Sequence, residues 1–224
     1  MCIRDRTVTV EVKDSLGSGI SGVPVEYYSG GWTSFGTTAG DGKVSKDLPS
    51  GTYSFRVSYG GASQEKSQNV GTNPTVVFQT TLVTMKLLDS DGTTELSGGA
   101  QYYASGWKTF GTGTTTTSME LLPLTYSFRV SYGGASQEKS QNVSSDSLVT
   151  FRTTLVTMKL LDSIGNELNG GAQYYASGYK TFGSGTTTAT MELLPLTYTF
   201  RVSYGGASQE KSQNVGIDSV VVFQ

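Results

Sequence analysis

The stretch TYSFRVSYGGASQEKSQNV, residues 52–70, decides the fold class of this chain. Its first half alternates Tyr53, Phe55 and Val57 with polar residues, which is the period of a β-strand with one buried face. Gly60-Gly61 then supplies a two-residue turn, because glycine tolerates the positive φ angles of tight hairpins. A second, polar strand follows, so the stretch predicts a β-hairpin.

Thirteen residues of this hairpin, SYGGASQEKSQNV, stand at 58–70 and recur without change at 131–143 and 203–215. The distance from Ser58 to Ser131 is 73 residues, and from Ser131 to Ser203 it is 72. A fixed period of this size indicates a linear array of similar modules. We therefore expect three repeats, the last one cut short at its C-terminal end, after a leader, MCIRDR, that is a scar or sequence-assembly artefact. The expected boundaries are 1–6 for the leader, 7–80 for unit one, 81–153 for unit two and 154–224 for unit three.

Unit one contains seven runs with strand periodicity, separated by turns rich in Gly, Pro, Asp and Ser. The expected strands are 7–13, 23–28, 32–37, 43–48, 52–59, 62–70 and 75–79. The chain is thus predicted to be all-β: three tandem seven-stranded antiparallel β-sandwiches, Ig-like or prealbumin-like, arranged as a rod.

A family resemblance rests on two segments of unit one, VEVKDSLGSGISGVPVEYY (10–28) and TTAGDGKVSKDLPSGTYSFRVSYGG (37–61). They resemble the prealbumin-like β-sandwich of carboxypeptidase regulatory-like and CnaB-type repeats of bacterial surface proteins. The resemblance implies the fold and, in many CnaB-type modules, a Lys–Asn isopeptide bond assisted by an acidic residue. The residues to consider would be Lys86, Lys159, Glu120 and Glu192. However, the last strands hold no Asn or Asp and unit one has Glu11 in the lysine position, so we do not expect this bond.

The joints between units are predicted from TVVFQTTLVTMKLL, residues 75–88, which has no Gly or Pro and exceeds the usual length of one strand. The last strand of one unit is expected to run into the first strand of the next. Such a joint is stiffer than a Gly/Ser linker. The neighbouring repeats are thus the first expected partners of each unit.

The second strand of the repeated hairpin is polar on both faces. Lys66 shares a face with Phe55 and Val57, so either a bulge shifts the register or the strand leaves the core. We interpret it as an edge strand guarded by charges, or as an assembly edge that contacts copies of the chain. The hairpin register also predicts that Arg56 lies opposite Glu65. The candidate assembly-edge residues are Gln64, Glu65, Lys66, Gln137, Glu138, Lys139, Gln209, Glu210 and Lys211.

Aromatic residues recur in YYSGGWTSFG (27–36) and its two copies. Adjacent tyrosines point to opposite faces of a strand, so one should be buried and one exposed. Trp32, Trp107 and Tyr179 occupy one equivalent position, and exposed rings there could stack on surface glycans. The alternative is that they pack in the core or at a joint.

The residue inventory excludes several functions. The chain has no histidine and one cysteine, Cys2, so catalysis based on His and zinc sites built from Cys and His are unavailable. The net charge is −2 with no Lys/Arg cluster, which argues against nucleic-acid binding, and no apolar run is long enough to insert into a membrane. DSDGTTE (89–95) resembles the start of a calcium loop but lacks its later ligands, so we expect a turn. We expect no cofactor, no metal and no enzyme activity.

These observations favour a structural role: an extracellular or cell-surface segment, such as the stalk or adhesin shaft of a large secreted bacterial protein. The alternatives are a subunit of an extracellular filament assembled through strand edges, and a carbohydrate-binding repeat.

Overall fold

The computed structural model describes residues 5–224. The first strand begins at Asp5, so Asp5 and Arg6 of the predicted leader pair with Pro49 and Leu48 of the same sheet. Residues 1–4 of that leader, including Cys2, lie outside the described residues. Between residues 5 and 224 the chain forms strands and turns without any helix.

Twenty-two strands follow one another in three similar sets. Unit one holds β1 (Asp5–Lys13), β2 (Pro24–Tyr28), β3 (Trp32–Thr37), β4 (Lys43–Pro49), β5 (Thr52–Tyr59), β6 (Ala62–Asn69) and β7 (Thr75–Gln79). Unit two holds β8 (Thr81–Leu88), β9 (Gly99–Tyr103), β10 (Trp107–Thr114), β11 (Thr117–Leu121), β12 (Thr125–Tyr132), β13 (Ala135–Asn142) and β14 (Leu148–Arg152). Unit three holds β15 (Thr154–Leu161), the short β16 (Glu167–Leu168), β17 (Gly171–Tyr175), β18 (Tyr179–Thr186), β19 (Thr190–Leu193), β20 (Thr197–Tyr204), β21 (Ala207–Asn214) and β22 (Val220–Phe223).

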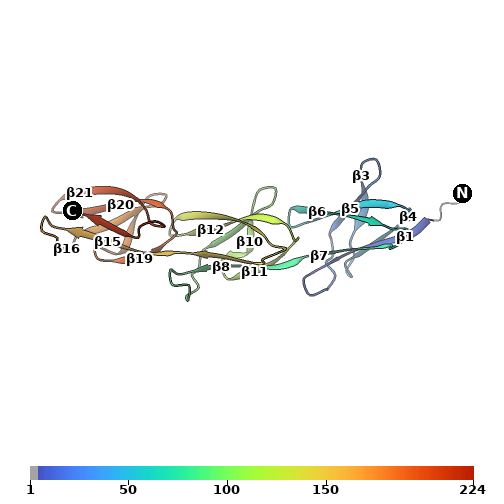
Figure 1. Ribbon diagram of the computed structural model, residues 1–224, viewed down its shortest axis with the longest axis horizontal. Coiled ribbons are helices and arrows are strands. Elements are labelled where there is room, and N and C mark those ends of the chain that lie inside the picture. The colour runs from blue at the N-terminus through green and yellow to red at the C-terminus, as the bar shows by residue number, and fades with distance from the viewer. Residues whose placement is uncertain (1–4) are drawn as a thin grey trace.

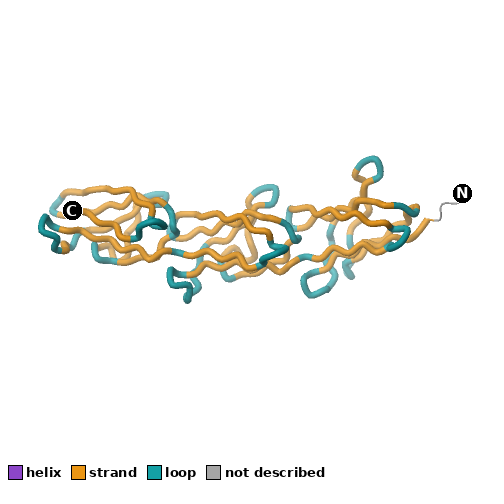
Figure 2. The backbone as a smooth tube through the Cα atoms, viewed as in Figure 1, coloured by secondary structure: helices purple, strands orange, loops and turns teal. Residues whose placement is uncertain are grey.

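Each unit is a sandwich of two sheets. In unit one the three-stranded sheet has the order β4-β1-β7 and the four-stranded sheet has the order β3-β2-β5-β6. Units two and three repeat this arrangement, except that the short strand β16 joins the sheet of β15 in unit three, so that both sheets of this unit have four strands. The three sandwiches lie end to end along the long axis (Figure 1), and loops project sideways from the strands (Figure 2).

One detail differs from the predicted antiparallel sandwich. The last strand of each unit pairs with the first strand in parallel, as β7 does with β1, β14 with β8 and β22 with β15. The physical reason is the course of the chain: the last strand leaves the unit at the end opposite to where the first strand enters. It therefore runs in the same direction as the first strand, and the next unit continues the rod.

The core of each unit comes from alternating residues of the two sheets. Val8, Val10 and Val12 of β1 are fully buried, and they face Phe55 and Val57 of β5 across the sandwich. The equivalent positions in units two and three form two further apolar clusters. The predicted division of the tyrosine pairs is confirmed most clearly in these units. Tyr102 and Tyr174 are buried, whereas Tyr103 and Tyr175 are half exposed.

The polar strand β6 keeps a regular register with β5, so no bulge is present. Instead, two side chains on the inner face of β6 reach across to β7 and to the loop before it. Lys66 Nζ donates to the Val77 carbonyl at 3.2 Å, and Gln68 Nε2 donates to the Asn73 carbonyl at 3.2 Å. In unit three, Lys211 donates to the Val222 carbonyl at 3.3 Å. The strand is polar on both faces because one face meets water and the other closes the side of the sandwich.

The predicted joint is confirmed with one refinement. β7 ends at Gln79 and β8 begins at Thr81, so a single residue, Thr80, separates the two strands. Thr80 is buried, and its backbone N–H donates to the Lys13 carbonyl at 2.9 Å. Thr153 has the same place between β14 and β15 and donates to the Leu88 carbonyl. Among the described residues, no helix has the length and apolar character needed to cross a membrane.

Candidate functional sites on the outer sheet face and at the joints

The recurring aromatic position lies on the outer face of the sheet that contains β3 and β5, or their equivalents in units two and three, where an arginine covers one side of the ring. The guanidinium carbon of Arg56 lies 4.0 Å from the ring centre of Trp32. The same pairs in units two and three, Arg129 on Trp107 and Arg201 on Tyr179, have distances of 3.7 and 3.6 Å. These are cation–π contacts between β3 and β5, between β10 and β12, and between β18 and β20.

A neighbouring tyrosine completes this outer cluster. Tyr28 contacts Trp32 edge to face at 5.6 Å, and its side chain remains 49% exposed. Trp32, Trp107 and Tyr179 are themselves only partly exposed, and one face of each ring is already occupied by arginine. The aromatic position is therefore neither core nor joint. Glycan stacking on these three rings stays a prediction. The neighbouring Tyr28, Tyr103 and Tyr175 are also exposed aromatic rings.

The predicted cross-strand ion pairs are present. Arg129 binds Glu138 at 2.6 Å and Arg201 binds Glu210 at 2.6 Å. In unit one the register places Arg56 opposite Glu65, but the arginine turns to Glu26 at 2.7 Å and lies 3.8 Å from Glu65. The difference follows from the sequence, because units two and three have glutamine at the position of Glu26.

Tyr179 adds a hydrogen bond that a tryptophan cannot make. Its hydroxyl donates to Glu210 Oε1 at 2.6 Å, beside the arginine that binds the same oxygen. The hydrogen bonds from Tyr179 and from Arg201 lower the pKa of Glu210, and the bond to Glu210 raises the pKa of Tyr179.

We expect Tyr179→Trp, which copies units one and two, to raise the pKa of Glu210 toward its ordinary value. The reason is that a carboxylate loses stabilisation of its charged form when a donor is removed. A carboxyl group with a lowered pKa stabilises the fold above its unfolded pKa, and this contribution is lost as the pH falls through the folded pKa. The variant should therefore lose stability less steeply in acid. NMR titration of the Glu210 carboxyl carbon measures the pKa directly, and an unchanged value would contradict the assignment.

The candidate assembly-edge residues lie on the outer strands β6, β13 and β21. In unit one they border a hollow of about 270 Å³ between β6 and β7. Glu65 points outward to the arginine, whereas Lys66 crosses the hollow to β7. This geometry gives the lysine an intramolecular partner. The hollow is lined by Gln64, Glu65 and Lys66, by Val77, Phe78 and Gln79, and by Pro123 of unit two.

Leucine side chains connect the cores of successive units. Leu122 belongs to unit two by sequence, yet it is fully buried in the apolar cluster of unit one. Leu124 packs against the same cluster, together with Tyr59 and Ala62 of the repeated hairpin. Leu194 and Leu196 of unit three contact the cluster of unit two in the same way. We call the segments Leu121–Leu124 and Leu193–Leu196 the leucine plugs.

Hydrogen bonds hold the hairpin turn against the next unit. The Tyr102 hydroxyl donates to the Gly60 carbonyl at 2.7 Å, and Ser105 Oγ donates to the Gly61 carbonyl at 3.2 Å. Tyr174 and Ser177 make the same bonds to Gly133 and Gly134. The glycine turn of the repeated thirteen residues is thus an inter-unit contact.

A carboxylate completes each joint. Glu120 of β11 accepts hydrogen bonds from Thr80 Oγ1 and from the backbone and hydroxyl of Ser15 in unit one. Glu192 accepts from Thr153 and Ser90 at the next joint. The two glutamates that the family resemblance associated with an isopeptide bond are therefore joint residues here.

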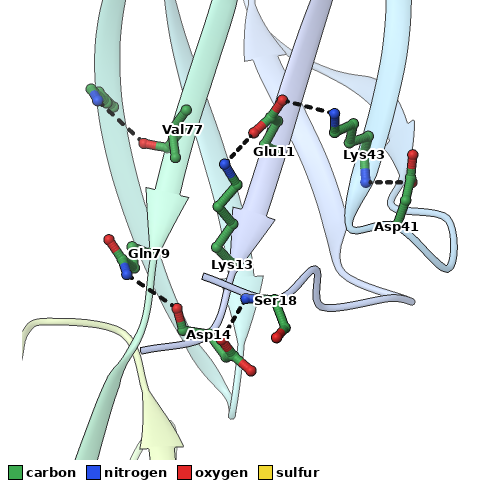
Figure 3. Close-up of polar contacts among 9 residues, drawn as sticks. Glu11, Lys13, Asp14, Ser18, Asp41, Lys43, Val77 and Gln79 are labelled. Atoms are coloured by element: carbon green, nitrogen blue, oxygen red, sulfur yellow. Dashed lines mark hydrogen bonds and ion pairs between the residues drawn. The ribbon is translucent and has the colours of Figure 1, made fainter. Parts of the chain in front are cut away.

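The lysines considered for that bond form ion pairs within their own units. Lys86 pairs with Glu95, and Lys159 pairs with Glu167 at 2.6 Å. In unit one a glutamate, Glu11, takes the place of this lysine. It forms ion pairs with Lys13 at 2.7 Å and with Lys43 at 3.2 Å (Figure 3). The hydrogen bond from Lys13, followed by the contact with Lys43, lowers the pKa of Glu11.

The expected turn at residues 89–95 is confirmed. Asp89 Oδ1 accepts hydrogen bonds from the backbone of Gly92, Thr93 and Thr94. Its carboxylate therefore closes a loop of the chain. Across residues 5–224, groups of three or more His, Cys, Asp or Glu side chains placed to share a metal ion do not occur.

The joint residues were missed by the sequence reasoning, although the signal was present. Unit one reads Leu48-Pro49-Ser50-Gly51 where unit two reads Leu121-Leu122-Pro123-Leu124. Two leucines that appear only in the later units indicate a contact that only those units make.

Comparison with known proteins adds structural neighbours only. No family model and no curated protein matches the chain. Similar solved structures include the Bacillus anthracis TIE protein, with 14% identity, a TM-score of 0.30 and coverage of 98% of this chain. The chain spans half the length of that protein. BcpA, the major pilin subunit of Bacillus cereus, has 10% identity and a TM-score of 0.27, with 98% of each chain covered. A streptococcal ancillary pilin has 16% identity and a TM-score of 0.25, and the match covers 99% of this chain and 98% of the pilin.

The fold assignment rests on the strand order and register of the units themselves. These confirm the architecture that the sequence resemblance implied. The chain consists of three tandem β-sandwiches that share one strand order.

Proposed function

We propose that the chain is a stiff shaft segment, the stalk of an adhesin or of a comparable bacterial protein that is secreted or held at the cell surface. The observation that carries this proposal is the shared burial at the joints, where Leu122 and Leu194 are 0% exposed inside the preceding unit. Bending at a joint would expose these leucines to water, at about 25 cal/mol for each Å² of apolar surface. The sequence resemblance to bacterial surface repeats supports the proposed location.

The polar bonds at each joint support the same role. Apolar contact alone resists separation, whereas the bonds from Tyr102 and Ser105 to the glycine turn also fix the direction of one unit relative to the next. Hydrogen bonds are directional, so they fix the relative orientation of two units that apolar contact alone would leave free to rotate. A stalk needs both properties, and it needs no catalytic residue.

Hydrogen bonds from the side chains of β6 to carbonyl groups of the same unit favour a spacer over a filament built through strand edges. Lys66 of β6 binds the Val77 carbonyl of β7, and Gln68 binds the Asn73 carbonyl just before β7, so these acceptors are used within the unit. Lysine on an edge strand also opposes pairing with another chain, because its charge would have to be buried. In the proposed function, the edge residues thus prevent β6 from pairing with a strand of another chain.

Electron microscopy across a concentration series tests the shaft proposal. We expect isolated straight rods of about 100 Å at every concentration, from strands of six to eight residues at roughly 3.3 Å each plus loops. Sizing chromatography should give one elongated monomer. Rods that bend freely at two points would contradict the stiff shaft, and ordered lateral sheets would support the filament alternative.

If sheets form, the triple variant Lys66→Glu, Lys139→Glu, Lys211→Glu identifies the surface responsible. Dissolution of the sheets would assign assembly to the candidate edge residues. Sheets that persist would place the contact on another face of the unit.

A further inference from the structure

The C-terminal end of unit three has an apolar hollow of about 170 Å³. It is lined by Leu160, Val202, Tyr204, Ala207, Ser208 and Gln209. Tyr204 is 53% exposed, and Leu160 and Val202 retain 7% and 2% exposure. An exposed tyrosine beside an open apolar hollow indicates a surface that another group can cover.

The same surface is covered in the other two units. Leu87 and Val130, which correspond to Leu160 and Val202, are 0% exposed in unit two. Tyr132 and Ala135, which correspond to Tyr204 and Ala207, pack against the core cluster that includes Leu194. The leucine plug of the next unit therefore fills this hollow at both internal joints.

The hollow of unit three is preformed. Gly205 and Gly206 have φ angles of 57° and 82°, close to the 61° and 85° of Gly133 and Gly134 at the occupied joint. The turn therefore keeps one conformation with or without a neighbour. A preformed surface binds its partner with little cost of ordering.

The chemistry of the partner follows from the plugs. The first unit of a second copy does not fit, because Pro49 and Gly51 stand where units two and three have leucines. Unit one therefore has no plug of the kind that units two and three have.

We propose that the C-terminal face of unit three is a socket for the Leu-Leu-Pro-Leu plug of a further repeat of the unit-two type, joined directly after β22. The tyrosine of that repeat equivalent to Tyr102 donates to the Gly205 carbonyl, and the serine equivalent to Ser105 donates to the Gly206 carbonyl. Stacking in the array then has one direction, with plugs pointing toward the N-terminus and sockets toward the C-terminus.

The test extends the chain with a copy of residues 80–153 placed after Gln224. This restores the register of the internal joints, because Gln224 follows Phe223 as Gln79 follows Phe78. We expect amide exchange across residues 202–209 to slow at least about tenfold relative to the 224-residue chain, since docking protects the turn from local opening.

Two matched variants of the extended chain make the result specific. In the first, the added plug reads Leu-Pro-Ser-Gly, as in unit one, and the protection should be lost. In the second, Ala207→Glu places a charge in the socket. Ala207 is exposed, so the 224-residue chain should tolerate this change while the extended chain loses protection. Equal protection with either plug sequence, or protection that survives Ala207→Glu, would overturn the socket.

The inference extends the proposed shaft, but the two can fail separately. Straight rods of the 224-residue chain together with an unprotected turn would retain the shaft and reject the socket. Flexible rods of the 224-residue chain together with a protected turn in the extended chain would reject the stiff shaft and retain the socket.

Discussion

Leu122→Ala is expected to lower the free energy of unfolding by about 2–5 kcal/mol, the range for removing a fully buried leucine side chain. Unit one should lose this stability, although Leu122 belongs to unit two by sequence, because the leucine lies in the core of unit one. Urea denaturation measures it, and the transition of unit one should separate from that of the remaining chain.

Leu148→Ala is the matched control, since Leu148 is 46% exposed in β14. The same chemical change there should alter the free energy of unfolding by less than about 1 kcal/mol. If the two variants were equally stable, Leu122 would not couple the units and the stiffness of the joint would need another origin.

Gly134→Ala is expected to destabilise the chain more than Gly206→Ala, although the two glycines occupy the same place in identical hairpins. Both have positive φ angles, 85° and 82°, so both variants should lose about 1–2 kcal/mol to backbone strain. A Cβ on Gly134 would also lie 2.9 Å from the carbonyl oxygen of Ala176 in unit three, whereas a Cβ on Gly206 meets no atom within 4 Å.

The difference between the two variants therefore isolates the joint contact from the turn itself. We expect it to be about 1–3 kcal/mol, as for other overpacked sites, and thermal unfolding of the two proteins side by side measures it. Equal destabilisation would mean that the hairpin turn does not press against the next unit. Gly61→Ala should behave like Gly134→Ala, because its Cβ would approach the Ala104 carbonyl at 3.0 Å.

The strands could be predicted from the sequence because alternation in a half-buried sheet is a local property. The hairpin of residues 52–70 appears as β5 and β6 in the expected register, and the strand expected at 32–37 is Trp32–Thr37. The boundaries shift by one or two residues where turns and strands share polar residues, as at Asp5.

The parallel pairing and the side-chain contacts at the joints could not be predicted in the same way. Whether β7 lies beside β1 depends on how the two sheets close, which no single run of residues encodes. The hydrogen bond from Lys66 to Val77 required the position of β7, and the role of Leu122 required the neighbouring core. Local patterns specify each sandwich, whereas contacts between distant segments specify the array.

The parallel ladder of first and last strands determines how the segment carries tension. A pull along the rod enters unit two at the start of β8 and leaves at the end of β14, and these two strands are hydrogen-bonded to each other over Leu148–Arg152. The load therefore shears this ladder, so that its bonds resist together instead of opening one after another. The four-stranded sheet, with its aromatic outer face, lies off the load path and would keep its shape while the shaft is under tension.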